Sequence, residues 1–286
     1  MKINLAVIGD PIAHSLSPVI HTTVLEELGI EYGYEKIRIA KGDLPPFLTS
    51  RQCFDMKGFN LTMPHKQDII PHLDFIDRDA QLFDSVNTVK VEGKRLLGYN
   101  TDGQGCLRAI EDKGYDCKGK NIVIFGAGGV ASTVALKMAF VNADSIIVLN
   151  RTLSSSQSLA ENIFKKTGKK IICGELNITE MTKSCQNCDI LINCTPLGME
   201  GVDRDFEDFS FLKALKRDAL VYDLIYKPEM TNLLKEASNL GLDTLNGLDM
   251  LIYQGLLADE IYLETSLDFP YLKEKIQQRM KKNKNF

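Results

Sequence analysis

Short apolar runs of strand length alternate with longer segments of helical periodicity along the whole chain. Residues 3–8 form an apolar run, and residues 18–28 carry apolar side chains at helical spacing up to Gly29. A continuous apolar run favours a buried strand, whereas apolar positions that recur once per helical turn favour a helix. Because this alternation is typical of parallel sheets with helices on both faces, the pattern predicts an α/β fold.

Turn residues and helix-stop residues divide this pattern into expected elements. In the first part of the chain, strands are expected at residues 3–8, 32–39, 57–61, 86–91 and 95–99, and helices at 18–28, 69–83 and 103–113. Glu92-Gly93-Lys94 predicts a hairpin turn, and the helix at 69–83 is expected to be broken near residues 71–74. In the second part, strands are expected at 121–125, 145–150, 170–173, 190–193, 220–223 and 243–245, and helices at 130–141, 154–166, 247–264 and 271–281.

A glycine-rich loop follows the expected strand at residues 121–125. Gly126-Ala127-Gly128-Gly129-Val130-Ala131 fits the pattern G-x-G-x-x-A and opens an expected helix. In this setting Gly126 would make the tight turn, Gly128 would let the backbone approach a pyrophosphate, and Ala131 would let helix and strand pack closely. The free N–H groups of the helix would then face the phosphates. The alternative is a glycine-rich turn without a ligand.

The end of the next expected strand distinguishes between the two nicotinamide cofactors. An NAD site usually has an acidic residue there, which bonds the ribose 2′-hydroxyl. In this chain the strand ends in Asn150-Arg151-Thr152. An arginine can pair with the 2′-phosphate of NADP, whereas an acid would repel it. The sequence therefore favours NADP, leaves NAD possible, and has a solvated surface arginine as its alternative reading.

Length and element order indicate two domains. A chain of 286 residues is long enough to divide into two domains of ordinary size. We expect an N-terminal α/β substrate-binding domain at residues 1–101, completed by C-terminal helices at 247–286. Residues 102–246 are expected to form a Rossmann-type, doubly wound parallel-sheet NADP-binding domain.

Four short polar segments lie at the ends of expected elements in the first domain. They are Ser15-Leu16-Ser17-Pro18, Asn60-Leu61-Thr62-Met63-Pro64-His65-Lys66, Val86-Asn87-Thr88 and Asn100-Thr101-Asp102-Gly103. An N-cap role alone explains Ser17, and capping or turns could explain several of the others. Together, however, they supply hydroxyls, carboxamides, a lysine and a carboxylate, which suits a small polyol. A lysine oriented by a carboxylate can also supply the proton that a ketone reduction requires.

These segments resemble, in order and over essentially the whole chain, the shikimate dehydrogenase family. The resemblance implies NADP-dependent, reversible reduction of 3-dehydroshikimate to shikimate, within chorismate and aromatic amino-acid biosynthesis. It implies Lys66 as the catalytic acid/base and Asp102 as its partner, with Ser15 and Ser17 on the substrate carboxylate. The implied substrate-binding residues are Ser15, Ser17, Thr62, Lys66, Asn87, Asp102, Tyr226 and Gln254.

Three further runs are similar to the family. Residues 193–199 resemble N-x-T-P-x-G-M, residues 222–226 resemble Y-D-x-x-Y, and residues 247–254 resemble G-x-x-M-L-x-x-Q. Core packing is the alternative for Met250 and Leu251. With the glycine loop included, the expected cofactor-binding residues are Gly126, Ala127, Gly128, Gly129, Val130, Ala131, Asn150, Arg151, Thr152, Thr195, Leu224 and Gly247.

Three positions depart from the family pattern. Asp84-Ser85 precede V-N-T where members often have a small residue and glycine. Leu153 and the serines that follow it replace a second basic residue, which would weaken the preference for NADP. Leu16 stands where many shikimate-specific members have lysine and where relatives that accept quinate often have leucine, so quinate stays open as a substrate.

Composition narrows the possible partners. The formal net charge of −4 argues against nucleic acid or an anionic membrane as the main partner. No secretory signal and no apolar stretch of membrane-spanning length is visible, and seven scattered cysteines suit reduced thiols, so we expect a cytoplasmic protein. Cys185 and Cys188 form a lone CxxC without a second pair, so no metal is expected. A monomer or a homodimer is expected.

Three other functions fit parts of the sequence. A quinate/shikimate dehydrogenase that also uses NAD would share every motif, and Asn150-Arg151-Thr152 is the discriminating segment. A methylenetetrahydrofolate dehydrogenase would need an aromatic side chain near Lys66 to stack on its pterin, and the sequence offers no suitable one. A non-catalytic NADP-binding sensor could dispense with Lys66 and Asp102, yet both are present.

Overall fold

The protein is described by a computed structural model that covers residues 2–282. The chain forms two compact units. The first unit comprises the described residues up to Thr101 and those from Ile252 onward, and the second comprises Asp102–Leu251. The chain therefore leaves the first unit once, builds the whole of the second, and then returns.

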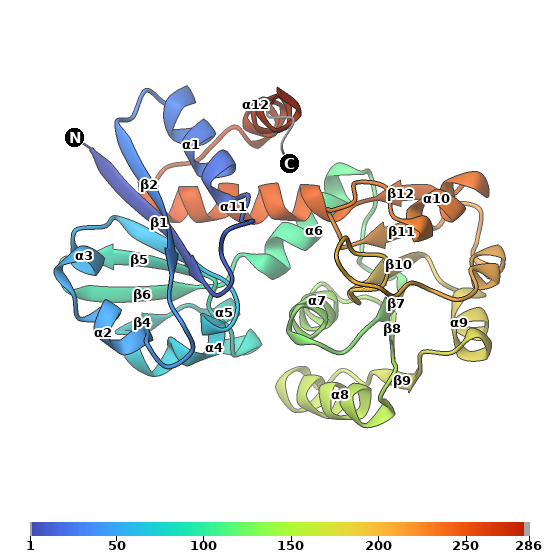
Figure 1. Ribbon diagram of the computed structural model, residues 1–286. Helices are drawn as coiled ribbons and strands as arrows, with labels where there is room; N and C mark the ends of the chain where they lie inside the picture. The colour runs from blue at the N-terminus through green and yellow to red at the C-terminus, as the bar shows by residue number, and fades with distance from the viewer. Residues whose placement is uncertain (1, 283–286) are drawn as a thin grey trace. The chain divides into compact units, whose positions relative to one another are not determined.

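The first unit is built on a mixed six-stranded sheet (Figure 1). Its order is β2(Tyr32–Arg38)-β1(Ile3–Gly9)-β3(Gly58–Leu61)-β5(Thr88–Glu92)-β6(Arg95–Tyr99)-β4(Phe75–Ile76). Strand β1 pairs in parallel with β2 and β3, whereas β5 runs antiparallel to both β3 and β6. The hairpin predicted at Glu92-Gly93-Lys94 is confirmed, and it makes this sheet mixed rather than fully parallel. The reason is that a short turn can only join antiparallel strands.

Helices cover both faces of this sheet. One face carries α1(Ser17–Glu27) and the later part of α11(Gly247–Leu263), where Leu25 and Ala258 pack with Leu5. The other face carries a core of sixteen buried residues that includes Phe47, Phe59 and Ile69. The remaining helical elements of the unit are α2(Leu44–Leu48), α3(Arg51–Phe54), α4(His65–Asp68), the 3-10 turn η1(Ile70–His72), α5(Arg78–Phe83) and α12(Phe269–Lys282).

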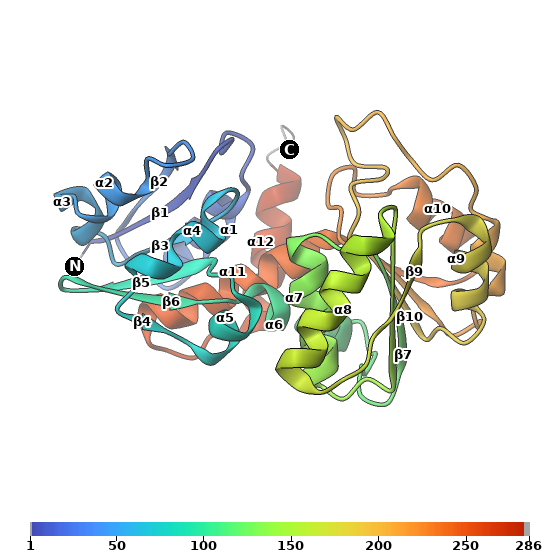
Figure 2. The same cartoon turned by 90° about the horizontal axis from the view of Figure 1, so that it is seen from below.

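The second unit is built on a fully parallel six-stranded sheet. Its order is β12(Asp243–Leu245)-β11(Leu220–Asp223)-β10(Ile190–Asn193)-β7(Asn121–Phe125)-β8(Ser145–Asn150)-β9(Ile172–Glu175). The helical elements are α6(Asp102–Asp112), α7(Gly129–Phe140), α8(Leu153–Thr167), α9(Ile178–Cys185), η2(Ser210–Ala214) and α10(Asn232–Asn239). Figure 2 shows α7 and α8 on one side of the sheet and α9 and α10 on the other. Because both faces are covered, every residue of β10 and β11 is buried.

Strand order reverses between β7 and β10 in this second sheet. The chain passes from β7 outward to β8 and β9, and then returns to the opposite side of β7 to form β10, β11 and β12. In open parallel sheets, the carboxyl ends of the strands at such a switch point border a crevice that binds ligands. The loops after β7 and β10 are therefore the places to look for a cofactor site.

The break expected near residues 71–74 in the helix at 69–83 is confirmed, but it is longer than expected. The segment consists of η1, the short strand β4 and α5, and only α5 is an α-helix. Pro71 disfavours helical backbone in the residue before it and has no N–H to donate, so the helix cannot pass through it. Helix α5 then starts afresh at Asp77, whose side chain accepts hydrogen bonds from the backbone N–H groups of Ala80 and Asp79.

Five short helices had no counterpart among the expected elements. They are α2, α3, α4, α9 and α10. Three of them begin at side-chain caps: Ser50 caps α3, Asn177 caps α9 and Thr231 caps α10. Each of these helices is only one or two turns long, so its apolar residues recur too few times to produce a periodic signal. Within residues 2–282, no helix combines the length and the apolar character needed to cross a bilayer.

Candidate active site

In the first unit, the expected substrate-binding residues gather at one edge of the sheet. The carboxyl ends of the parallel strands β1, β3 and β6 and the amino end of the antiparallel strand β5 share this edge, because Asn60 pairs with Thr88 and Thr88 with Tyr99. Thr62 and Lys66 follow β3, and Asn87 directly precedes β5. Strand direction therefore brings together segments that are far apart in sequence.

Asn87 is the centre of the polar network at this edge. It is 2% exposed, and its side-chain Nδ2 donates to the Thr101 hydroxyl at 2.9 Å and to the Gln254 side-chain oxygen at 3.3 Å. Its Oδ1 accepts from the Thr101 backbone N–H and from the Thr88 hydroxyl, each at 2.9 Å. The structure thus brings Asn87 and Gln254, two of the expected substrate-binding residues, into direct contact. Their rigid pairing presents carboxamide groups of fixed orientation.

Lys66 is half-buried on the short helix α4, and hydrogen bonds of Lys66 and of its neighbour His65 hold the backbone there. Its carbonyl oxygen accepts from the Val86 N–H at 2.8 Å, one residue before Asn87. The neighbouring His65 is fully buried, and its Nε2 lies 2.7 Å from the Ile39 carbonyl oxygen. Asp102 is 8% exposed and is the first residue of α6, directly after Thr101, which Asn87 holds. The backbone of both expected catalytic residues is therefore tied to the Asn87 network.

The two serines of the first polar segment adopt a geometry that differs from the expectation. Ser17 is the first residue of α1, Leu16 occupies the cap position, and no side chain caps this helix. The Ser17 N–H instead donates to the Ser15 hydroxyl at 3.3 Å. The N-cap role predicted for Ser17 is wrong, because Pro18 lies at the second helical position rather than the first. The buried Ser17 hydroxyl is thereby not used as a cap.

In the second unit, the glycine loop has the shape that a bound pyrophosphate requires. Gly126 has φ of +104°, and a Cβ there would lie 3.2 Å from the Cys194 backbone of the neighbouring β10 loop. Gly128 and Gly129 face open space, with no heavy atom within 4 Å of an added Cβ. Ala131, the third residue of α7, is 1% exposed. The loop therefore leaves room for phosphate at the first N–H groups of α7, so these residues fit a dinucleotide.

The end of β8 carries the residues expected to select the cofactor. Asn150 bonds the Thr152 carbonyl oxygen through Nδ2 at 3.0 Å, which closes a tight turn around Arg151. Arg151 is exposed, as are Ser154 and Ser155 at the start of α8. The turn thus offers one guanidinium and two hydroxyls to a phosphate at this position.

A buried polar network that the sequence analysis did not assign supports the loop after β10. Asn193 is fully buried, accepts from the Thr195 hydroxyl at 2.7 Å, and donates to Asp223 at 3.0 Å. Asp223 also accepts from the Thr231 hydroxyl at 2.7 Å and from the Ile225 N–H at 3.1 Å. Burial raises the pKa of Asp223 to about 6, against the opposing effect of these donors. The N-x-T-P and Y-D-x-x-Y runs contained the signal for this network, because Asn193 and Asp223 are each the last residue of a buried strand.

Replacing Asp223 with asparagine is expected to stabilise the protein above about pH 7 and to leave it unchanged near pH 4. The raised pKa means that the folded state keeps a proton that the unfolded state has released, so stability falls as pH rises from 3.8 to about 6. A shift of that size corresponds to at most about 3 kcal/mol, which Asp223→Asn would recover in part. Urea unfolding across this pH range measures the difference.

Asp189 provides a control for which the expected change in stability has the opposite sign. Burial works to raise the pKa of Asp189, but the Lys216 ammonium at 2.6 Å and the Asn121 N–H outweigh it, so the pKa is lowered. Asp189→Asn is therefore expected to destabilise the protein at neutral pH and to have less effect in acid. An Asp223→Asn variant that is less stable than the parent at every pH would contradict the proposed cost of the buried charge.

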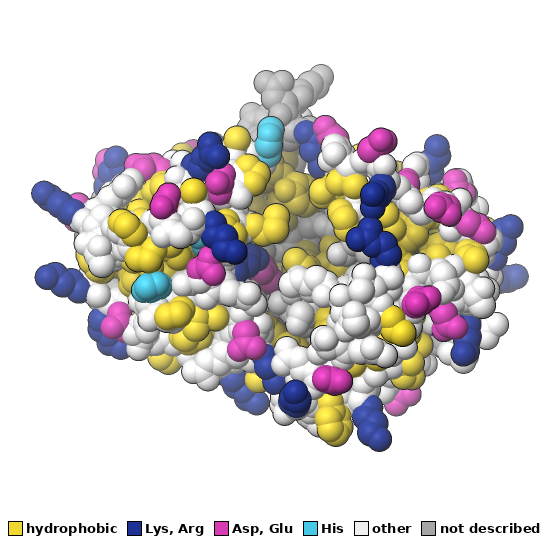
Figure 3. All heavy atoms as spheres, turned by 60° about the horizontal axis from the view of Figure 1, so that its bottom comes forward, with side chains coloured by type: hydrophobic (Ala, Val, Ile, Leu, Met, Phe, Trp, Pro, Cys, Tyr) yellow, Lys and Arg dark blue, Asp and Glu magenta, His cyan; other side chains and the backbone are white. Residues whose placement is uncertain are grey.

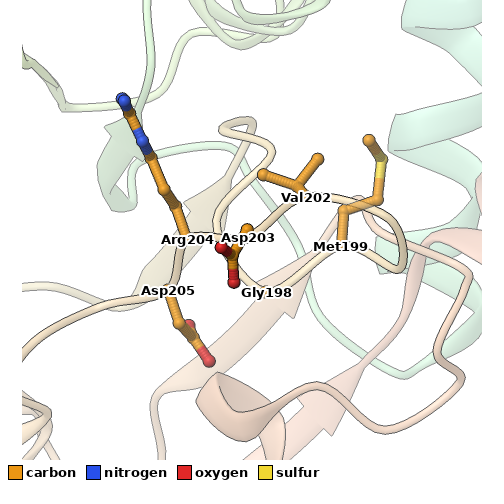
Figure 4. Close-up of a pocket in the computed structure, with 6 residues that line it drawn as sticks. All are labelled: Gly198, Met199, Val202, Asp203, Arg204 and Asp205. Atoms are coloured by element: carbon orange, nitrogen blue, oxygen red, sulfur yellow. The ribbon is translucent and has the colours of Figure 1, made fainter.

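The loop after β10 borders a hollow of about 370 Å³. Its lining residues are Gly198, Met199, Val202, Asp203, Arg204 and Asp205. Asp205 bonds Asn232 at 2.7 Å, and the Gly198 N–H bonds the Arg204 carbonyl oxygen at 2.9 Å. In Figure 4, Arg204 and Met199 extend in different directions from this loop. The hollow therefore belongs to the same edge of the sheet as Thr195.

Three of the remaining expected residues follow β11 and β12. Leu224 is half-buried and Tyr226 is 39% exposed, while burial raises the pKa of the Tyr226 hydroxyl. Gly247 opens α11 against the loop after β11, where an added Cβ would lie 1.9 Å from the Leu224 carbonyl oxygen. Glycine is therefore required at position 247 by close backbone packing.

The remaining sequence motif, the CxxC at residues 185–188, has both of its cysteines buried. Cys185 and Cys188 are buried in the core of the second unit, and burial raises the pKa of the Cys185 thiol to about 12 and that of Cys188 further. Protonated, buried thiols behave as small apolar side chains. On the face shown in Figure 3, basic and acidic side chains are interspersed.

A parallel sheet with a phosphate-binding glycine loop at its switch point, and a second sheet edge rich in hydroxyl and carboxamide groups, define a nicotinamide-dependent oxidoreductase. Two family models match the chain: "Shikimate dehydrogenase substrate binding domain" over residues 7–89 and "Shikimate / quinate 5-dehydrogenase" over residues 108–205. The chain belongs to the shikimate dehydrogenase family.

Individual relatives agree with this assignment. The chain is 39% identical over 278 residues to the shikimate dehydrogenase (NADP(+)) of Methanocaldococcus jannaschii, and the matched residues make up 97% of each protein. A crystal structure of a shikimate dehydrogenase in complex with NADP+ matches with a TM-score of 0.88 at 37% identity, over 97% of this chain and 96% of that one. The shikimate 5-dehydrogenase of Listeria monocytogenes, in complex with shikimate and NAD, matches with a TM-score of 0.87 at 31% identity, over 96% of each chain.

Proposed function

We propose that this chain catalyses the NADP-dependent, reversible reduction of 3-dehydroshikimate to shikimate, in the biosynthesis of chorismate and the aromatic amino acids. The observation that carries the proposal is the Asn87–Gln254 contact at the sheet edge that also bears Thr62 and Lys66. Full-length relatives named as NADP-dependent shikimate dehydrogenases support it.

The roles of the substrate-binding residues follow from their chemistry. Ser15 and Ser17 would hold the substrate carboxylate, and Asn87 and Gln254 would bond the ring hydroxyls. Thr62, Asp102 and Tyr226 complete the proposed set. A polyol ligand requires many neutral donors and acceptors, because each buried hydroxyl left unmatched costs binding free energy. The paired carboxamides have fixed orientations in advance, so little conformational freedom is lost on binding.

Lys66 is proposed as the residue that moves the proton. When bound, NADPH supplies the hydride that reduces the C3 carbonyl. Negative charge then develops on the carbonyl oxygen, and the Lys66 ammonium stabilises this charge and donates a proton to it. In the reverse direction, the neutral amine of Lys66 accepts the proton of the C3 hydroxyl. Asp102 would orient Lys66 and favour its charged form.

The dinucleotide would be held by the switch-point loops of the second unit. The N–H groups of Gly128, Gly129 and Val130 at the start of α7 would bind the pyrophosphate, and Arg151 would bind the 2′-phosphate. Thr195, Leu224 and Gly247 lie on the loops after β10, β11 and β12, at the same edge of the parallel sheet. They would border the nicotinamide end of the cofactor.

Initial rates of shikimate oxidation with NADP and with NAD, repeated with quinate, test this function. Rapid turnover of shikimate with NADP alone is the expected result. Failure to oxidise either acid with either cofactor would refute the assignment.

The second candidate function is a quinate/shikimate dehydrogenase that also accepts NAD. Two observations favour it: Leu16 lies between the two serines, and the exposed Ser154 and Ser155 carry no charge to assist Arg151. One family model that matches the chain is itself described as shikimate / quinate 5-dehydrogenase. Comparable rates with quinate or with NAD in the same assay would establish this function.

Replacing Arg151 with alanine is expected to raise the KM for NADP by about ten- to a hundredfold, with little change in the KM for NAD. The loss corresponds to about 1.5–3 kcal/mol for a hydrogen bond to a charged group. Arg217→Ala, another exposed arginine of the second unit, is the matched control and should leave both values unchanged. An equal rise in both KM values would show that Arg151 does not recognise the 2′-phosphate.

The proposal extends to location and assembly. The seven cysteines are all free thiols, which suits a cytoplasmic protein. A monomer or a homodimer is proposed, and size-exclusion chromatography with light scattering would reveal a larger assembly.

A further inference from the structure

A fully buried ion pair lies behind the substrate-binding edge of the first unit. His21 of α1 and Asp259 of α11 are both 0% exposed, and His21 Nδ1 lies 2.7 Å from Asp259 Oδ1. Among the described residues, His21 Nε2 and Asp259 Oδ2 have no hydrogen-bond partner. Buried polar groups that are only partly hydrogen-bonded are costly, so this pair calls for a reason beyond core stability.

Two tyrosines enclose the pair. The Tyr34 ring stacks on His21 with centroids 5.3 Å apart at an interplanar angle of 12°, and the Tyr262 ring lies 6.2 Å away at 54°. Tyr262 fills the space above Gly58, where an added Cβ would lie 2.3 Å from its ring. Tyr262 is fully buried and Tyr34 is partly buried, burial raises the pKa of each hydroxyl well above the ordinary range, and Asp259 adds to the rise in each.

The enclosed pair connects to substrate-binding residues on both sides. Ser17 lies one helical turn before His21 on α1, and the His21 ring stacks on Tyr34. Tyr262 packs over Gly58 of β3, the strand that pairs with β5, and Thr88 at the start of β5 bonds Asn87 at 2.9 Å. Gln254, which contacts Asn87, lies on the same helix as Asp259.

The two helices approach each other closely one turn from the ion pair. Gly255 of α11 lies against Ile20 of α1, and an added Cβ there would lie 2.7 Å from the Ile20 side chain. Apolar contact sets the distance between the helices, but it tolerates sliding along their axes. A short, directional ion pair opposes such sliding, because its strength depends on the register of the two partners.

We propose that the His21–Asp259 pair is a positioning device that fixes the register of α1 against α11, and thereby the spacing between the substrate-carboxylate residues Ser15 and Ser17 and the ring-hydroxyl residues Asn87 and Gln254. Neither member of the pair contacts substrate. The inference rests on the proposed function, since it concerns residues assigned there to substrate.

The test compares three variants of the full-length protein by steady-state kinetics and thermal unfolding. Asp259→Leu is expected to raise the KM for shikimate about tenfold, the factor that corresponds to loss of one well-aligned hydrogen bond to substrate. The kcat and the KM for NADP are expected to stay within about twofold, because the cofactor loops lie in the other unit. Asp259→Asn can still accept from His21, so it should restore the KM for shikimate to near its parent value.

The double variant His21→Leu/Asp259→Leu separates positioning from stability. An apolar pair of similar volume commonly restores the stability that a single change removes from a buried ion pair. If the pair fixes register, the double variant regains thermal stability but keeps the raised KM for shikimate. Leu44→Ala, a buried change in the other core of the same unit, controls for general loss of stability and should leave the KM unchanged.

Two outcomes would overturn the inference. One is a parent-like KM for shikimate in Asp259→Leu, and the other is recovery of KM together with stability in the double variant, which would make the pair merely structural. Both require a parent protein that oxidises shikimate with NADP. A parent without that activity would instead refute the proposed function, so the two failures are distinguishable.

Discussion

Replacing Lys66 with alanine is expected to lower kcat for shikimate oxidation by about a hundred- to ten-thousandfold, with little change in either KM. Proton transfer by a positioned side chain contributes a factor of about this size. The variant should fold normally, because the anchoring contact of Lys66 is made by its backbone carbonyl oxygen with the Val86 N–H, and alanine keeps that bond. Steady-state rates with saturating shikimate and NADP measure the effect.

Gln67→Ala provides the matched control for this prediction. Gln67 is the exposed neighbour of Lys66 on the same short helix, so its replacement tests whether any change in α4 disturbs the site. A small primary amine added to the assay should partly restore the rate of Lys66→Ala, since it can act as the missing proton carrier. A Lys66→Ala enzyme with parent kcat would eliminate Lys66 as the acid/base.

Replacing Gly247 with alanine is expected to lower the free energy of unfolding by about 3 kcal/mol or more. The added methyl group would lie 1.9 Å from the Leu224 carbonyl oxygen, so one of the two backbone segments has to move. Both are held: the Leu224 N–H bonds the Asn193 carbonyl oxygen at 3.0 Å, and the Gly247 N–H bonds the Ile225 carbonyl oxygen at 3.0 Å. Urea unfolding followed by far-ultraviolet circular dichroism measures the loss.

Gly129→Ala is the appropriate comparison, because an added Cβ at that position meets no heavy atom within 4 Å. It lies at the first position of α7, where alanine is a good helix former, so stability should change by less than about 1 kcal/mol. Equal losses of stability in the two variants would mean that close packing at Gly247 is not the reason for glycine there.

Much of the second unit could be predicted from the sequence because its strands are buried on both faces. Strands β7, β8, β10, β11 and β12 have the bounds that the apolar runs indicated, and β10 and β11, at the centre of the sheet, are buried throughout. The elements that were missed depend on single contacts. Thr231 caps helix α10 by accepting a hydrogen bond from the Leu234 N–H, and its hydroxyl bonds Asp223. Neither contact produces a periodic signal in the sequence.

The composition of the site was more predictable than its internal contacts. Asn87, Thr101 and Gln254 all lie in the motifs through which the chain resembles the family. The bond between Asn87 and Gln254 joins residues 167 positions apart, which no local pattern encodes. The same holds for His21 and Asp259, which look like an ordinary helical histidine and an ordinary surface acid until α1 and α11 are placed together.

The division of the first unit into two chain segments has a consequence for the order of folding during synthesis. The second unit is continuous, so a ribosome releases all of Asp102–Leu251 before the segment from Ile252 onward emerges. Until then Leu5, Ile20 and Leu25 lack their partners on α11, and a nascent chain would carry an exposed apolar face on its N-terminal sheet. The core on the other face lies wholly within the N-terminal segment, so only the face that packs against α11 would be completed last, and that face is the natural target for a chaperone.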